Sequence, residues 1–145
     1  MCDRSCLDIA EAAFKTIQAR CSTIQVCQNT SDPVEATLDI PVQPGLKYAV
    51  TLSLQNQDEL HFSVENFRLE WMPCTKQSTV DAYIDAVVGF LSGRYRILEH
   101  YRGYQCTMAE LQVPTQTGAW VTLGVSRHLC LPFLRQSSCK VIRNL

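Results

Sequence analysis

The 145-residue sequence contains no long apolar run. Its longest uninterrupted stretch, residues 86–91, is much shorter than the roughly 20 residues that a membrane-spanning helix needs. The N-terminal residues follow an amphipathic pattern, whereas a secretory signal has a continuous apolar core. We therefore expect no membrane crossing and a cytoplasmic location.

Glycine-rich phosphate loops are also missing. The six glycines, at positions 45, 89, 93, 103, 118 and 124, are scattered and match neither a Walker-type loop nor a dinucleotide-binding spacing. Nucleotide-dependent chemistry is therefore not expected, and the sequence predicts no cofactor.

Histidines are few, with three in the chain. His128 and Cys130 are two residues apart, so on an extended segment they would point the same way and could form a thiolate–imidazole pair. No neighbour in the sequence would orient that imidazole. We therefore predict no catalytic residue.

Acidic residues are absent from the last 35 positions, because all fourteen carboxylates lie at or before Glu110. Residues 1–93 carry six basic and twelve acidic side chains, a net charge of −6, and residues 94–145 carry seven and two, a net charge of +5. The total of −1 hides this asymmetry. Opposite charges steer association, so the pattern points to a second copy of the chain or to another protein as partner.

Cysteines, in contrast, are abundant, with eight in the chain. Zinc sites usually take two close ligand pairs, each with two to four residues between its members, and these positions do not supply two such pairs. A chain of this length can build a core without disulfides. We therefore predict no metal site and reduced thiols, several of them packed as small apolar side chains.

Hydrophobic periodicity predicts two helices. Apolar residues at alternating steps of three and four follow Ser5, which with Asp8 resembles a capping box, so the first helix is expected to begin at Cys6. The second is expected between Ser78, as its N-cap, and Gly93, as its terminator.

Alternating polar and apolar residues predict the strands. They cover residues 47–55, 60–71, 94–101, 104–113 and 119–125, with shorter edge strands over 37–42 and 140–145. The apolar positions change from even-numbered to odd-numbered residues near Glu65 and Asn66, which we call a change in apolar parity. We predict a β-bulge there. Residues 128–135 fit either a strand or a helical turn.

The predicted fold is a single α+β domain over residues 1–145. Its two helices pack on one face of an antiparallel, curved β-sheet, in the order α-β-β-α-β-β-β. This element order resembles that of type III secretion chaperones and that of the cone-shaped fold of nuclear transport factor 2. No motif in the sequence is specific to either.

The densest group of polar and aromatic residues is 93–104, GRYRILEHYRGY. On a strand, Arg94, Arg96, His100 and Arg102 would share one face at intervals of about 6 to 7 Å. Together with Tyr101 they form a candidate anion-binding surface, since arginine binds carboxylates and phosphates and tyrosine can stack on bases. The interpretation that we prefer is structural, in which the arginines pair with acids of the first half, such as Glu65 or Glu70, and the tyrosines cover the edge of the sheet. The near-neutral total charge disfavours a nucleic acid.

A second candidate site is an apolar pocket. If the sheet is curved, its walls could be Tyr48, Phe62, Trp71 and Trp120. The leading functional hypothesis is a non-catalytic protein-binding adaptor or a homo-oligomer. The alternatives are a small-ligand pocket protein or small enzyme, and an anion or RNA binder.

Overall fold

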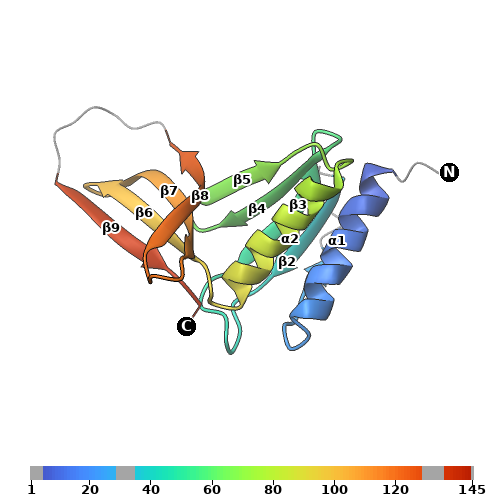
Figure 1. The fold of residues 1–145 in the computed structure, drawn as a ribbon, viewed down its shortest axis with the longest axis horizontal. Coiled ribbons are helices and arrows are strands. Elements are labelled where there is room, and N and C mark those ends of the chain that lie inside the picture. The colour runs from blue at the N-terminus through green and yellow to red at the C-terminus, as the bar shows by residue number, and fades with distance from the viewer. Residues whose placement is uncertain (1–4, 29–34, 129–135, 145) are drawn as a thin grey trace.

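The computed structural model describes residues 5–28, 35–128 and 136–144. Within them the chain is an α+β fold, as predicted (Figure 1). Its elements are α1 (Cys6–Arg20), β1 (Cys27–Gln28), β2 (Ala36–Ile40), β3 (Val50–Gln55), β4 (Glu59–Val64), β5 (Phe67–Trp71), α2 (Gln77–Leu91), β6 (Arg96–Arg102), β7 (Gln105–Pro114), β8 (Trp120–Arg127) and β9 (Ser137–Ile142).

The strands form two antiparallel sheets where the sequence predicted one. The first sheet has the order β1-β2-β3-β4-β5, and the second has the order β8-β7-β6-β9. Both helices lie side by side on one face of the first sheet, as predicted, and the second sheet begins after α2 and lies beyond β5 (Figure 1). The strands after α2 therefore do not extend a single curved sheet around the helices.

The helix ends follow local capping chemistry. The Ser5 hydroxyl accepts a 3.1 Å hydrogen bond from the Asp8 amide, and α1 begins at Cys6 as predicted. The prediction of Ser78 as the cap of α2 is wrong, because the helix starts one residue before it and Lys76 occupies the N-cap. Gly93 ends the helix as predicted, with a φ of +79° that a residue with a Cβ rarely adopts. Neither described helix is long and apolar enough to span a membrane.

The helices cover a continuous apolar surface of the first sheet. Leu52 pairs across the strands with Leu38 on one side and with Phe62 on the other, and Phe62 in turn pairs with Leu69. The first three of these side chains are fully buried. Burial of such side chains against α1 and α2 is the main stabilising contribution in this half of the molecule.

The β-bulge predicted at residues 65–66 is wrong, because these residues form the turn of a hairpin. Val64 and Phe67 are direct partners across β4 and β5, and Glu65 adopts a φ of 50°. A two-residue turn places the residues on either side of it on the same face. This explains the change in apolar parity without an extra residue in a continuous strand.

The two sheets share one core and are joined by a polar contact at the β4–β5 turn. Glu99 of β6 is 1% exposed, and its carboxylate accepts hydrogen bonds from the Asn66 amide at 3.2 Å and from the Tyr101 hydroxyl at 3.0 Å. Desolvation and the nearby carboxylate raise the pKa of Tyr101 to about 12. His128 contacts the carbonyl oxygen of Asn66 through Nε2 at 2.6 Å. The turn is thereby fixed to the second sheet.

The six described cysteines are free thiols. Their side chains range from buried Cys74 to exposed Cys27 and Cys139. Cys2 and Cys130 lie outside the described residues.

Candidate binding face of the second sheet

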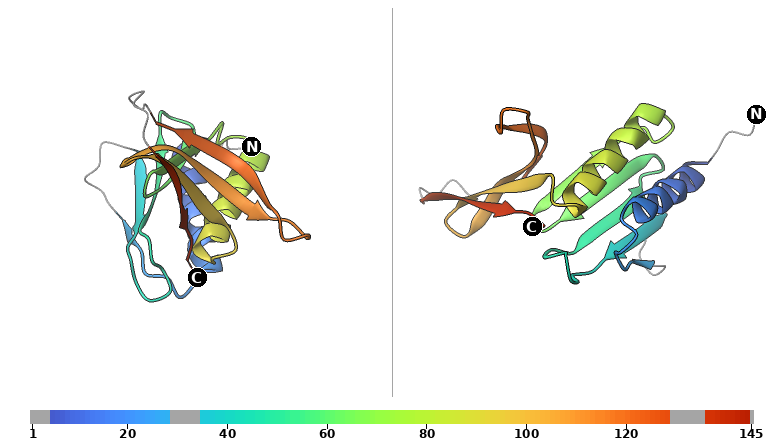
Figure 2. Two further views of the ribbon diagram at one scale, coloured as in Figure 1. Left: turned by 90° about the vertical axis from the view of Figure 1, so that its left-hand side faces the viewer. Right: turned by 60° about the horizontal axis from the view of Figure 1, so that its bottom comes forward.

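The boundary between the two sheets coincides with the boundary in charge. The described residues before position 94 form both helices and the first sheet, and those from position 94 onward form the second sheet, so the charge boundary of the sequence falls between the two layers. The two layers lie at opposite ends of the molecule (Figure 2). The charge asymmetry of the sequence is therefore an asymmetry in space.

The outer face of the second sheet carries much of the positive charge. Its inner face holds the buried side chains of Ile97, Ala109 and Leu111. Strand alternation and register place the following residues on the outer face, which we call the basic face: Arg96, Leu98, His100, Arg102, Met108, Glu110, Gln112, Trp120, Thr122, Val125, Arg127, Cys139, Val141 and Arg143. It includes four arginines and one carboxylate.

Three of the five predicted binding residues lie on this face. Arg96, His100 and Arg102 alternate along β6 as expected for a strand. Arg94 precedes the strand, and its guanidinium lies 5.2 Å from the centroid of the Tyr95 ring. Tyr101 points the other way, toward Glu99 and Asn66 at the junction between the sheets.

An aromatic ring organises one end of the basic face. The guanidinium carbons of Arg96 and Arg143 lie 4.1 and 5.1 Å from the centroid of the Trp120 ring, within the range of cation–π attraction. The Nε of Arg96 donates to the Gln112 side chain at 2.9 Å, and that of Arg143 donates to the Gly93 carbonyl at 2.7 Å. Both guanidiniums are therefore held in place before any ligand binds.

The opposite end has a surface hollow of about 450 Å³. Its lining includes Arg102, Met108, Arg127, Ser138 and Cys139. Among the described residues, no carboxylate lies within 4 Å of the Arg102 or Arg127 guanidinium. The expected pairing of the arginine row with acids of the first half is not seen in this part of the chain.

Four residues next to this hollow form a chain of contacts. The thiol of Cys139 lies 3.5 Å from His100 Nδ1, and His100 Nε2 lies 2.6 Å from Glu110 Oε2. The other carboxylate oxygen, Oε1, accepts a hydrogen bond from the Thr122 hydroxyl at 2.9 Å. Hydrogen bonding by His100 is the main cause that lowers the pKa of Glu110, with smaller contributions from Thr122 and the charge of Arg127. The carboxylate is therefore ionised at neutral pH.

The middle of the basic face holds three apolar side chains. Leu98 pairs with Val141 of β9 on one side and with Glu110 of β7 on the other, and Glu110 in turn pairs with Val125 of β8. Val141 is 46% exposed, and the other two side chains are half-buried. Between its two groups of arginines the face therefore presents three apolar side chains, with Glu110 between Leu98 and Val125.

The four proposed pocket walls do not line one common pocket, although two of them pack together. Phe62 and Trp71 pack beside α2, with ring centroids 6.4 Å apart, and Trp71 lies 5.5 Å from the ring of Tyr83. Tyr48 is half-buried just before β3, whereas Trp120 lies on the second sheet. Phe62, Trp71 and Tyr48 therefore pack in or against the core of the first sheet, whereas Trp120 belongs to the basic face.

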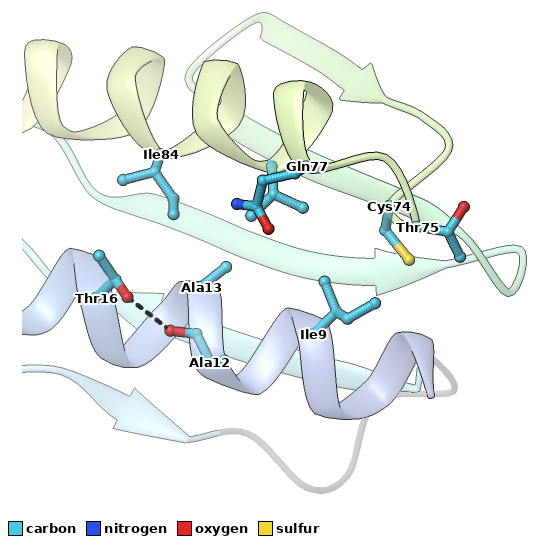
Figure 3. A pocket seen from close by; sticks show the side chains of 9 residues that line it. Ile9, Ala12, Ala13, Thr16, Cys74, Thr75, Gln77 and Ile84 are labelled. Atoms are coloured by element: carbon cyan, nitrogen blue, oxygen red, sulfur yellow. Dashed lines mark hydrogen bonds between the residues drawn. The ribbon is translucent and has the colours of Figure 1, made fainter. Parts of the chain in front are cut away.

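A second surface hollow of about 650 Å³ lies between the two helices (Figure 3). Ile9, Ala13, Cys74, Gln77 and Ile84 contribute to its walls. None of the lining residues is a carboxylate, guanidinium or imidazole group. The groove therefore offers no charged anchor, and the basic face is the stronger candidate site.

Several residues that shape the basic face were not predicted from the sequence, namely Glu110, Arg127, Cys139 and Arg143. Alternation along residues 104–113 places Glu110 opposite to the buried side chains, but only strand pairing shows that it meets His100. The predicted pair of His128 and Cys130 cannot be compared, because Cys130 lies outside the described residues. Across the described residues, no group of three or more His, Cys, Asp and Glu side chains could hold a metal ion.

No protein-family model matches the chain, and neither a curated protein nor a solved structure matches it. Its function is therefore inferred from the geometry of the basic face.

Proposed function

We propose that the protein is a binding domain that recognises an acidic protein partner through the basic face. The observation that supports this most is the composition of that face, which has four arginines and a single carboxylate. That carboxylate, Glu110, is engaged by His100 and Thr122. The outward charge of the face is therefore positive.

The arginines are suited to binding carboxylates. Arg96 and Arg143 each use Nε within the protein, and no described residue accepts from their terminal nitrogens. A planar guanidinium can bind a carboxylate with two parallel hydrogen bonds. Because these side chains are already positioned, less conformational entropy is lost when a partner binds.

The spacing of the face defines the partner further. Successive outward residues on a strand are about 6.7 Å apart, so Arg96 and Arg102 are about 20 Å apart along β6. Leu98, Val125 and Val141 lie between them, and the one carboxylate in that row, Glu110, is already bound by His100 and Thr122. The best complement is an extended acidic segment with carboxylates at both ends and apolar side chains in its middle.

Charge on the rest of the chain favours a protein over a nucleic acid. Residues 1–93 carry a net charge of −6, which repels a polyphosphate at long range. A short acidic protein segment carries less charge and can contact the basic face alone.

Fluorescence anisotropy with a labelled peptide tests the proposal. The peptide has two glutamates at each end and alternating valine and threonine between them, and the control peptide has lysines in place of the glutamates. We expect saturable binding of the glutamate peptide alone, with an affinity that falls as salt concentration rises. Equal binding of the lysine peptide, or tighter binding of a single-stranded RNA, would overturn the proposal.

Paired arginine variants locate the binding surface. Arg102→Gln with Arg127→Gln removes two charges that make no hydrogen bond within the described residues, so the fold should be retained, as circular dichroism would check. Lys15→Gln with Arg20→Gln removes two exposed charges from α1 and is the matched control. We expect weaker peptide binding for the first pair and unchanged binding for the control pair. The opposite pattern contradicts the proposal.

A second copy of the chain could also act as the acidic partner of the basic face. The solvent-facing side of the first sheet carries Asp39, Glu59 and Glu70 against the single basic residue Arg68. Contact between this side of one copy and the basic face of another would be head-to-tail. Light scattering at low and high salt decides between self-association and a different acidic partner.

A further inference from the structure

Cys139 lies in a setting that differs from that of every other described cysteine. Its thiol, the His100 imidazole, the Glu110 carboxylate and the Thr122 hydroxyl are connected by contacts of 3.5, 2.6 and 2.9 Å. Each of the four strands of the second sheet, β9, β6, β7 and β8, supplies one member. The order nucleophile, base and orienting carboxylate is that of an activated nucleophile.

The protonation states follow from this order. Glu110 is ionised at neutral pH and can only accept hydrogen bonds, so the imidazole nitrogen facing it, Nε2, carries the proton. In neutral His100 the other nitrogen, Nδ1, then has a free lone pair directed at Cys139. The thiol can donate its proton to Nδ1, and Glu110 stabilises the imidazolium that forms.

Access and charge also favour reaction at this thiol. Cys139 is exposed on the edge strand β9 and lines the surface hollow of about 450 Å³. Arg102 and Arg127 line the same hollow. Their positive charge attracts small molecules that carry carboxylates.

We propose that Cys139 is a nucleophilic thiol that exchanges with small disulfides bearing carboxylates. Arg102 and Arg127 bind the carboxylates while the thiol attacks the disulfide. This inference does not depend on the proposed recognition of an acidic protein, because it rests on contacts around Cys139 and His100.

The reaction needs no oxidant other than the disulfide itself. His100 takes the thiol proton, and the resulting Cys139 thiolate attacks one sulfur of the disulfide. A new bond forms between Cys139 Sγ and that sulfur as the original S–S bond breaks. The departing thiolate then takes the proton from the imidazolium, so that the products are a mixed disulfide on Cys139 and one free thiol.

Cys27 is an internal control for this reactivity. It is the other exposed cysteine among the described residues, and no described imidazole contacts it. Any difference in rate between Cys139 and Cys27 therefore reports on the surroundings of the two thiols more than on their access to solvent.

Site-resolved mass spectrometry provides the test. The reduced full-length protein is incubated with glutathione disulfide, which carries carboxylates, or with cystamine, which is cationic, and mixed disulfides at both cysteines are quantified over time. With glutathione disulfide at pH 7 we expect modification of Cys139 about tenfold faster than of Cys27 or more. The ratio should be smaller with cystamine. Equal rates at the two cysteines with glutathione disulfide overturn the proposal.

His100→Gln identifies the base. At pH 7 this variant should form the mixed disulfide at Cys139 at a rate near that of Cys27. The difference in rate from the wild-type protein should shrink at higher pH, where hydroxide in solution can take the thiol proton in place of His100. His61→Gln is the matched control, because His61 has a similar 2.9 Å contact with Glu59 on the other sheet. An unchanged Cys139 rate in His100→Gln, or an equal loss in both variants, contradicts the role of His100.

Two further variants separate this site from peptide binding. Glu110→Gln should lower the Cys139 rate less than His100→Gln does, because Glu110 acts through the imidazole. Arg96→Gln with Arg143→Gln, at the far end of the face, should weaken peptide binding and leave the Cys139 rate unchanged. Loss of Cys139 reactivity in that pair would contradict a local site at Cys139.

Discussion

Gly124 of β8 lies directly against Leu69 of β5, so that a Cβ atom at position 124 would be 2.3 Å from Leu69 Cδ2. This close approach is one of the contacts that hold the second sheet against the first. Any larger residue at position 124 must push Leu69 or the strand aside.

Gly124→Ala is therefore expected to destabilise the protein by about 1 to 3 kcal/mol, the usual cost of overpacking. Urea unfolding followed by circular dichroism measures this change. In a Leu69→Ala background the new methyl group has room, so the same substitution should cost much less. An equal cost in both backgrounds would show that steric contact with Leu69 is not the cause.

Tyr101→Phe removes the hydroxyl that donates to the buried Glu99 carboxylate. We expect a loss of about 1 to 3 kcal/mol, because the buried side chain of Glu99 loses a hydrogen-bond donor. Tyr104→Phe is the control, since Tyr104 is 94% exposed and should tolerate the change. Equal unfolding free energies for the two variants would contradict the structural role of the Glu99–Tyr101 contact.

Cys74 should resist alkylation. Its side chain is 1% exposed, and desolvation, with a smaller contribution from Cys6, raises the pKa of its thiol to about 12. At pH 8 iodoacetamide should therefore label Cys27 and Cys139 within minutes, whereas Cys74 reacts only in denaturant. Peptide mass spectrometry at timed intervals reads out each site. Labelling of Cys74 at the same rate as Cys27 would contradict the buried position of the Cys74 side chain.

Glu110 should make stability depend on acid pH. Its pKa is lowered in the folded protein by His100, Thr122 and Arg127, so the folded state favours the ionised carboxylate. This contribution is complete above the ordinary pKa of a glutamate, about 4.3, and is lost as pH falls through the lower folded value.

Glu110→Gln should accordingly destabilise the protein at pH 7, and the difference from the wild-type protein should narrow toward pH 3. Urea unfolding at both pH values measures it, with Glu70→Gln, an exposed position on the first sheet, as the control. A difference that stays constant between the two pH values would contradict the assigned contacts of Glu110.

The helices were predictable because their signals are local. The apolar stripe of α1 and the Ser5 cap lie within a few turns of one another, so short-range periodicity locates the element and its start. The hairpin at Glu65 was misread for a physical reason. A bulge and a two-residue turn both shift the apolar parity, and this turn contains no glycine to distinguish them.

Sheet membership could not be read from the sequence. Alternation shows which residues share a face of one strand but does not show which strands pair. The contact of His100 with Glu110 and Cys139 joins residues 10 and 39 positions apart in the chain. Arg96, His100 and Arg102 were recognised because they alternate on a single strand, whereas Cys139 required the pairing of β6 with β9.

The separation of charge between the two layers gives the molecule a large electric dipole moment in spite of a net charge of only −1. Such a molecule rotates in the field of a charged object before contact, so the second sheet turns toward a negative surface and the helical layer turns away from it. Attraction between dipoles in pure water is weakened by added salt. The protein should therefore become more soluble as moderate amounts of salt are added near its isoelectric point.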